Sequence, residues 1–283
     1  MDAIHPFDSL MPRQIAAKAE DVGVAKGHMD APTTLLLAIL AGAFISMGAV
    51  FSTVAATGSV ALPFGVGRIL AGLAFCLGLI LVVVAGAELF TGNNLLLMAF
   101  ASRKLSWRLL LRNWVLVYLG NMAGAVATAL GMYLAALHNL GAGQVGQTML
   151  TIAHGKLELG WGEAFARGVF CNALVCLAVW ICMSCRTTGE KVLAIVFPIT
   201  AFVASGFEHS VANMYFVPAA IFVQDWGPAG AQAAPGLSGV MPLEWGPFVL
   251  HNLVPVTLGN IVGGGVLVGI VYWEVYCRRA RVV

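Results

Sequence analysis

The sequence has few charged residues. Only 10% of its 283 residues are charged, whereas a soluble domain carries roughly 25%. Hydrophobic residues make up 60% of the chain and the mean hydropathy is +0.89. Because so little charge is available to cover a water-facing surface, the composition argues against a soluble domain and indicates a polytopic membrane protein.

Other features are also missing. No cluster of lysine and arginine is interleaved with aromatic residues, so we expect no nucleic-acid partner. The six cysteines lie within or beside apolar runs, which predicts buried thiols and no disulfide framework. Cys182 and Cys185 form a C-x-x-C pair without a second pair or a histidine, so we expect no metal and no cofactor. The first thirty residues lack a continuous apolar core, and we expect no signal peptide there.

Apolar segments dominate what is present. Six of them, at about 33–57, 68–101, 108–137, 162–184, 191–223 and 247–276, reach the ~20 residues that cross a bilayer. An even number of crossings places both termini on one side. Twelve of the fifteen lysines and arginines flank one face, and only Arg68, Lys156 and Arg167 flank the other. The positive-inside rule therefore predicts cytoplasmic termini.

Two of these segments are interrupted by glycine and an acid near the middle. The interruptions read GAELFTGN in 68–101 and SGFEHSVAN in 191–223. At 1.5 Å per residue, either segment as one helix would extend about 50 Å, against a hydrocarbon core of about 30 Å. We therefore expect a broken helix in each.

The two interruptions follow one pattern. Gly86-Ala-Glu88-x4-Asn93 aligns without gaps on Gly206-Phe-Glu208-x4-Asn213, and Asn113-x6-Gly120-Asn121-x2-Gly124 aligns on Asn252-x6-Gly259-Asn260-x2-Gly263. The chain is predicted to be a duplication of three crossings, inverted because three is odd. We expect copies at 33–137 and 162–276 in a single channel domain, 1–283, with cytoplasmic segments at 1–30 and 277–283.

One histidine marks the second interruption. We interpret His209 as the only histidine inside a span, where an ionisable group is a functional site by default. The alternative is a packing histidine that bonds a carbonyl. The first copy has Leu89 at this position, so the histidine is a specialisation of the second copy. Beyond each break we expect a half-helix capped by Thr91 or by Ser210.

The residues shared by both copies favour a structural role. Glu88 and Glu208 could accept hydrogen bonds from amides freed by the breaks or pair with a lysine such as Lys156. Asn121 and Asn260 are expected to bond between helices, with pore lining as the alternative. Asn93 and Asn213 complete this supporting set. Phe75 and Leu79 share a helical face and could narrow a pore or belong to an ordinary core.

The motifs ELFTGNN, CNALVCLAVW, ASGFEHSVANMYFVP and VPVTLGNIVGGGVLVGIVYW together resemble the formate/nitrite transporter family, and HPFDSLMP resembles its bacterial formate channels. The resemblance covers about residues 5 to 276. It implies an all-α membrane fold with six transmembrane helices per protomer, an aquaporin-like shape and a homopentamer in the bacterial inner membrane. FTGNN after Glu88 is closer to nitrite and archaeal formate members.

The resemblance also implies roles for particular residues. His209 and Thr91 would form the pore centre, and Lys26 would belong to a mobile gating segment. The constrictions and the polar vestibule would be formed by Phe75, Leu79, Phe202, Leu89, Phe90, Asn172 and Lys156.

The implied function is passive or proton-coupled passage of formate and similar small anions, with protons and lipid as the other partners. A nitrite- or hydrosulfide-preferring member and a neutral-solute aquaporin-like channel remain alternatives, although the paired Asn-Pro-Ala signature of aquaporins is absent. An intramembrane serine protease is disfavoured because no Gly-x-Ser-x-Gly elbow occurs. We expect no enzyme activity.

Overall fold

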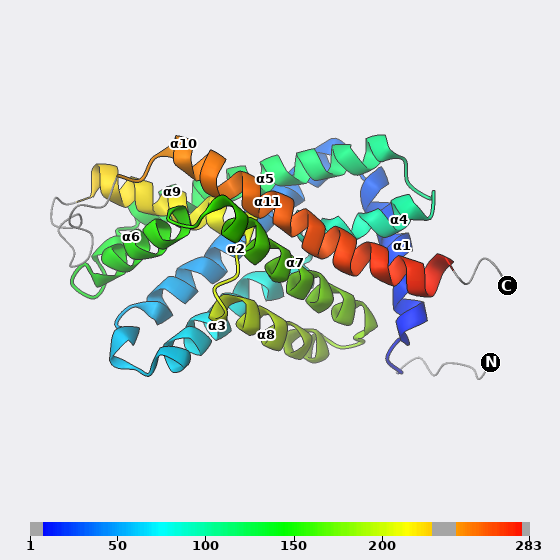
Figure 1. The fold of residues 1–283 in the computed structure, drawn as a ribbon, viewed down its shortest axis with the longest axis horizontal. Helices are drawn as coiled ribbons and strands as arrows, with labels where there is room; N and C mark the ends of the chain where they lie inside the picture. Colours follow the sequence, from blue (N-terminus) through cyan, green and yellow to red (C-terminus); the bar gives the residue numbers. More distant parts are fainter. Residues whose placement is uncertain (1–7, 228–241, 279–283) are drawn as a thin grey trace.

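The computed structural model describes residues 8–227 and 242–278, and all regular elements in these ranges are helices (Figure 1). Parts of the predicted cytoplasmic segments, 1–7 and 279–283, lie outside the described residues, and so do residues 228–241. Arg279 and Arg281, counted among the charges of the cytoplasmic face, fall in 279–283.

The long helices follow the apolar segments. They are α2 (Ala31–Ala56), α3 (Phe64–Ile80) with its extension η2 (Leu81–Gly86), α5 (Trp107–Leu134), α7 (Trp161–Ser184) and a last helix, Trp245–Arg278, whose parts are α10 (Trp245–Pro247), η6 (Phe248–Leu253), α11 (Val254–Asn260), η7 (Ile261–Ile270) and η8 (Trp273–Arg278). The shorter helices are α1 (Pro12–His28), η1 (Ser59–Ala61), η3 (Gly92–Leu95), α4 (Leu96–Ala101), η4 (Leu137–Asn139), α6 (Gln144–Leu157), α8 (Thr188–Ala204) and α9 (Ser210–Trp226).

Five of the helices are long and apolar enough to cross a membrane: Ala31–Ala56, Phe64–Gly86, Trp107–Leu134, Trp161–Ser184 and Trp245–Arg278. The remaining predicted segment, 191–223, is divided between α8 and α9, which have 17 residues each. The protein is therefore a multi-pass membrane protein. Helices α1 and α6 lie outside the predicted segments.

Side chains at the helix starts explain where several of these elements begin. Asp30 accepts a bond from the Thr33 amide at the start of α2, and Ser106 accepts one from the Leu109 amide at the start of α5. Thr187 and Glu190 form a reciprocal capping pair at the start of α8. Each cap satisfies amides that have no partner within the helix.

The duplicated glycines bring helices into close contact. A Cβ atom at Gly124 of α5 would overlap the carbonyl oxygen of Ile39 in α2, and one at Gly263 of the last helix would overlap that of Val169 in α7. Small residues at such crossings allow the backbones of membrane helices to approach closely. The α2–α5 pair and the α7–α11 pair therefore pack in the same way.

The molecule has two ends, along the horizontal direction of Figure 1. At one, here called the α1 end, α1 packs against Met98, Trp180 and Trp273, so the last helix finishes beside α1. At the other, the α6 end, the Thr57 and Thr148 hydroxyls bond at 3.1 Å, joining the end of α2 to α6. The first and last described helices thus reach the same end.

Candidate functional site

Both interrupted segments leave the helix at a glycine. In the first segment the helix formed by α3 and η2 ends at Gly86, and the chain becomes helical again at Gly92. In the second segment α8 ends at Ala204, two residues before Gly206, and α9 begins at Ser210. Gly86 and Gly206 have φ values of +84° and +72°. Glycine reaches this left-handed region without steric cost, which explains why both copies carry it at the turn out of the helix.

A polar cluster holds the first break. Lys26 Nζ lies 3.0 Å from Glu88 Oε1 and donates to Asn93 Oδ1 at 2.8 Å. Asn93 Nδ2 donates to Glu88 Oε2 at 2.7 Å and to Asn113 Oδ1 at 3.0 Å. Asn113 in turn donates to the Lys26 carbonyl at 3.2 Å. The C-terminal end of α1 is thereby tied to the break.

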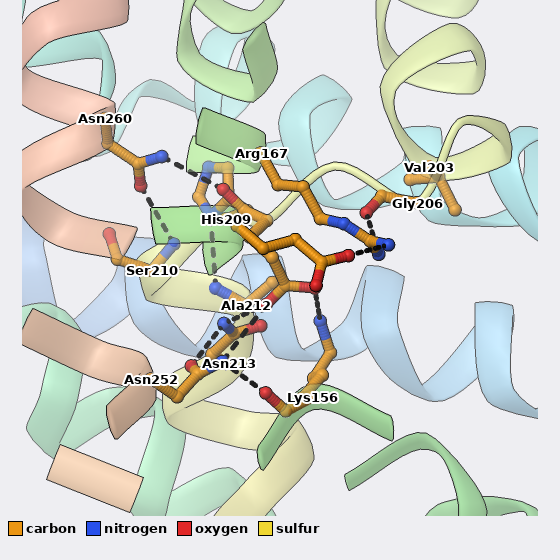
Figure 2. Close-up of polar contacts among 12 residues, drawn as sticks. Lys156, Arg167, Val203, Gly206, His209, Ser210, Ala212, Asn213, Asn252 and Asn260 are labelled. Atoms are coloured by element: carbon orange, nitrogen blue, oxygen red, sulfur yellow. Dashed lines mark hydrogen bonds and ion pairs between the residues drawn. The ribbon is translucent and has the colours of Figure 1, made fainter. Parts of the chain in front are cut away.

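Corresponding residues hold the second break by a similar set of contacts (Figure 2), although the Lys26–Asn93 bond has no counterpart there, since Asn213 Oδ1 has no partner among the described residues. Lys156 Nζ lies 2.8 Å from Glu208 Oε1, and Asn213 Nδ2 donates to Glu208 Oε2 at 2.6 Å and to Asn252 Oδ1 at 2.7 Å. Asn252 donates to the Lys156 carbonyl at 3.0 Å. Lys156 therefore corresponds to Lys26, and both lie outside the copies predicted at 33–137 and 162–276.

Asn121 and Asn260 bind the exposed backbone of the breaks. Asn121 donates to the carbonyls of Ala38 and Glu88, at 2.8 and 2.9 Å, and accepts from the Phe90 amide at 2.9 Å. Asn260 donates to the carbonyls of Gly168 and Glu208, at 2.9 and 3.0 Å, and accepts from the Ser210 amide at 2.9 Å. Irregular backbone at membrane depth requires partners of this kind inside the protein.

His209 and Thr91 join the two breaks. His209 Nε2 lies 3.1 Å from Thr91 Oγ1, and His209 Nδ1 accepts from the Ala212 amide at 3.1 Å. Because Nδ1 is the acceptor, the neutral ring carries its proton on Nε2 and donates it toward Thr91. Both side chains are buried. The arrangement places a proton donor at the junction of the two copies.

Three expectations about these residues were wrong. His209 is the residue that caps α9, and Ser210 is its first helical residue. Thr91 makes no side-chain cap bond to the helix that follows it; its hydroxyl contacts His209 instead. His209 is also not the only histidine in a candidate span, because His251 lies exposed in Trp245–Arg278.

A pair of aromatic rings lies on one side of the histidine. Phe75 and Phe202 meet edge to face with ring centres 5.6 Å apart, and Phe202 stacks on His209 at 5.9 Å. Leu79 and Leu89 are buried nearby and line a cavity described below. Phe90, in contrast, packs against Trp114 and Tyr118 of α5. Phe75 and Phe202 therefore lie beside the histidine and Leu79 and Leu89 line the cavity, whereas Phe90 faces α5.

Asn172 contacts the first break and the last helix. Its Nδ2 lies 2.7 Å from the Asn260 carbonyl, 2.8 Å from Asn94 Oδ1 and 3.2 Å from the Thr91 carbonyl. It is completely buried. Its amide therefore links α7 to the last helix and to the residue opposite His209.

A cavity of about 420 Å³ opens beside the first break at the α1 end. Its walls include Lys18, Lys26, Lys191 and Glu88, and Leu79 and Leu89 are among its apolar lining. Lys18 donates to the Met183 carbonyl at 2.8 Å. Sequence reasoning missed Lys18 and Lys191 because it counted them only as topology signals; their position at one face was the available indication.

Comparison with known proteins gives the same result at three levels. The family model described as Formate/nitrite transporter matches residues 13–274. A relative named Formate channel FocA from Escherichia coli (strain K12) is 42% identical over 281 residues, 99% of each chain. Another Formate channel FocA, from Haemophilus influenzae, is 37% identical over 93% of each chain.

Solved structures agree. One described as "Pentameric formate channel with formate bound" superposes with a TM-score of 0.82 at 45% identity, covering 88% of this chain and 98% of the other. An "FNT family ion channel" superposes with a TM-score of 0.78 at 27% identity, covering 93% and 98%. The chain is thus a member of the formate/nitrite transporter family, whose members are channels and transporters rather than enzymes.

Proposed function

We propose that this protein passes formate and similar small monovalent anions across the membrane through a pore centred on His209 and Thr91. One observation carries the proposal: a cavity lined by three lysines, Leu79 and Leu89 lies at the first break, whose Thr91 meets His209, and His209 stacks on Phe202 of the Phe75–Phe202 contact. The combination of a cationic vestibule, an apolar constriction and a proton donor suits an anion that must lose its charge or its hydration water to cross the membrane.

The architecture that we propose has six crossings in an inverted three-plus-three repeat of aquaporin-like shape. The corresponding contacts around Glu88 and Glu208 support it, with α8 and α9 together forming the sixth crossing. Since Lys26 and Lys156 correspond, each repeat is extended to begin at α1 or α6. The whole chain is a single channel domain with cytoplasmic termini in the bacterial inner membrane. The pentamer named for the structural relative supports a homopentamer.

The chemistry follows from the cost of the charge. A carboxylic acid with a pKa near 4 is about 99.9% ionised at neutral pH, and carrying its charge through apolar rings is costly. The cavity lysines raise the local anion concentration. His209 then gives the anion a proton or a strong hydrogen bond, while Thr91 orients it. Transfer of the proton would move one proton with each anion.

Lys156 and Lys26 receive a revised role in this proposal. Each is paired with a break glutamate, so the two lysines first position the breaks. Lys26 also faces the cavity, where Lys18 and Lys191 supply further positive charge. Gating by the segment that contains Lys26 would then require the Lys26–Glu88 pair to separate.

Flux in proteoliposomes tests the proposal. Formate, nitrite and hydrosulfide are compared at two pH values, with protein-free vesicles as the baseline and urea as a neutral solute. We expect formate flux well above the baseline, little urea flux, and flux that rises as the pH falls. Formate flux equal to that of the protein-free vesicles would refute the proposal.

A further inference from the structure

Two arginines converge on the second break from the side of the α6 end. Arg68 of α3 donates to the carbonyls of Ala204 and Val203, at 3.1 and 2.7 Å, and Arg167 of α7 donates to the Gly206 carbonyl at 3.2 Å. A Cβ atom on Gly206 would lie 3.3 Å from Arg68 Nη2 and 3.5 Å from Arg167 Nη1. Figure 2 shows the Arg167 guanidinium beside Gly206 and Val203.

Both guanidinium groups keep donors for a further acceptor. An arginine has five N–H donors. Within the described residues, Arg68 uses its Nε and Nη2 atoms, and Arg167 uses Nη1 and, toward the exposed Glu163, Nη2. Among the described residues no carboxylate forms an ion pair with Arg68, and Glu208, whose charge also acts on Arg68, is paired with Lys156. The pair therefore carries an excess positive charge, and both side chains are half-buried.

The arginines lie on the proposed route. Arg68, Phe75 and Leu79 are spaced by seven and four residues, which places them along one face of α3. Arg68 is thus two turns from the Phe75–Phe202 contact, on the side of the α6 end. Arg167 gives its carbonyl to the Glu208 amide at 3.3 Å, so it flanks the residue next to His209.

The backbone contacts that support the break do not require an arginine at position 167. In the first copy the Glu88 amide bonds to the carbonyl of Leu37, so Leu37 occupies the position that Arg167 has in the second copy. The same backbone contact forms there without a guanidinium. The charge at position 167 is therefore an addition to the shared frame, as is the histidine at position 209.

We propose that Arg68 and Arg167 form an anion-binding subsite at the pore mouth on the α6 end, which takes small carboxylates and other oxyanions. The proposal rests on the proposed function and extends it to this mouth. Guanidinium groups fixed by backbone carbonyls suit the planar oxygen pair of a carboxylate. Sulfate fits the same chemistry, but because one proton leaves it charged, it binds there without passing the apolar constriction.

Flux from a defined side tests the subsite. Vesicles of known orientation carry the wild type, Arg167→Leu, Arg167→Lys or Arg68→Gln, with Leu chosen because Leu37 occupies the corresponding position. For formate presented at the α6 end, we expect Arg167→Leu and Arg68→Gln to raise the half-saturating concentration about fivefold to tenfold, and Arg167→Lys to raise it less. Formate presented at the α1 end is the internal comparison. An unchanged half-saturating concentration in both charge-removing variants would overturn the proposal.

Sulfate provides a second measurement that does not need formate transport. At equal ionic strength, sulfate in place of chloride should raise the Tm of the detergent-purified wild type by about 2–4 °C, and this rise should be lost in an Arg68→Gln, Arg167→Leu double variant. The same rise in both proteins, or no rise in the wild type, would show that the arginines only cap α8. Absence of formate flux with the sulfate effect intact would instead count against the proposed function alone.

Discussion

The two helix breaks have one framework and different linings. Each has a left-handed glycine, a glutamate paired with a lysine, and three asparagines at corresponding positions. The lysine of the first break also bonds Asn93, whereas the corresponding oxygen of Asn213 has no partner among the described residues. The first break opens on a cavity with lysines, and a Cβ on Gly86 would meet no atom within 4 Å. The second is covered by Arg68 and Arg167 and carries His209. The frame thus keeps the backbone ordered, and residues added to it differ in their chemistry.

Substitution of the break glutamates should have the largest effect on stability, because both belong to the contacts that the two breaks share. Glu208→Ala leaves the Lys156 ammonium, only 15% exposed, without its partner. Loss of one partner of a buried pair is strongly destabilising, so we expect a cost of about 3 kcal/mol. Glu88→Ala should cost less because the Lys26 side chain is 26% exposed. Thermal unfolding in detergent measures both, with Glu→Gln variants as controls that keep an acceptor. Equal losses at the two breaks would contradict the difference in burial.

Alanine substitutions at Gly86 and Gly206 test how much room each break leaves for a side chain. Gly86→Ala meets only the strain of a left-handed backbone, about 1–2 kcal/mol. Gly206→Ala has the same backbone strain and adds a tight approach to Arg68 Nη2, at 3.3 Å, so its cost should be higher than that of Gly86→Ala. Unfolding curves of the two variants give the comparison, and Gly189→Ala, where a Cβ has open space and an ordinary φ, is the control. A larger loss at Gly86 would show that the arginines do not crowd Gly206.

Substitutions of His209 distinguish its structural role as the cap of α9 from its proposed role as a proton donor. His209→Asn keeps a short side chain that can cap α9 but removes the titratable ring, and we expect about tenfold less formate flux and a weaker pH dependence. His209→Leu should lower both the flux and the thermal stability, because it also removes the cap. Flux at two pH values together with Tm distinguishes the variants. If His209→Asn kept the wild-type rate and pH dependence, the proton-donor role would be lost.

Substitution of Glu20 should have the smallest effect of these changes. It tests how α1, which packs beside the first break, is anchored. Glu20 bonds the Ser102 hydroxyl and lies 2.6 Å from Lys104 Nζ, which anchors α1. Burial raises the pKa of Glu20, but its bonds to Lys104 and Ser102 outweigh this effect, and the pKa lies below its ordinary value of 4.5. A lowered pKa means that this stabilisation is present above pH 4.5 and is lost as the pH falls through the folded-state pKa.

We therefore expect α1 to stay anchored between pH 8 and pH 5. Amide hydrogen exchange in α1, corrected for the intrinsic effect of pH, should be constant over this range in the wild type and about two- to fivefold faster in Glu20→Gln at pH 7. Exchange that accelerates in the wild type between pH 7 and pH 5.5 would point to another titrating group at the α1 end.

Much of the site was predictable because its residues recur. The repeated Gly-x-Glu-x4-Asn pattern identified Glu88, Asn93, Glu208 and Asn213, and all four lie in the contacts that hold the breaks. Pairing of a break glutamate with a lysine such as Lys156 was one of two alternatives, and the Lys156–Glu208 ion pair supports that alternative. The corresponding pairing of Lys26 with Glu88 was missed, because α1 and α6 are not apolar segments and their sequences share no evident pattern.

Other features could not be predicted because they depend on how distant segments meet. Arg68 and Arg167 are separated in the chain by α4, α5 and α6, and only the packing of α3 and α7 around α8 brings their guanidinium groups to Gly206. The capping role of His209 depends on the path of the chain after Gly206, which turns its Nδ1 toward the Ala212 amide. Phe90 faces α5 for the same kind of reason.

The sequence by itself determined that the chain is a multi-pass membrane protein with a duplicated break, because hydropathy and spacing are local properties of the chain. The tertiary structure alone decided which charges are neutralised and which remain available. Lys26 and Lys156 are paired, whereas the Arg68–Arg167 pair keeps excess charge, and this distinction arises from distances between helices that no local pattern encodes.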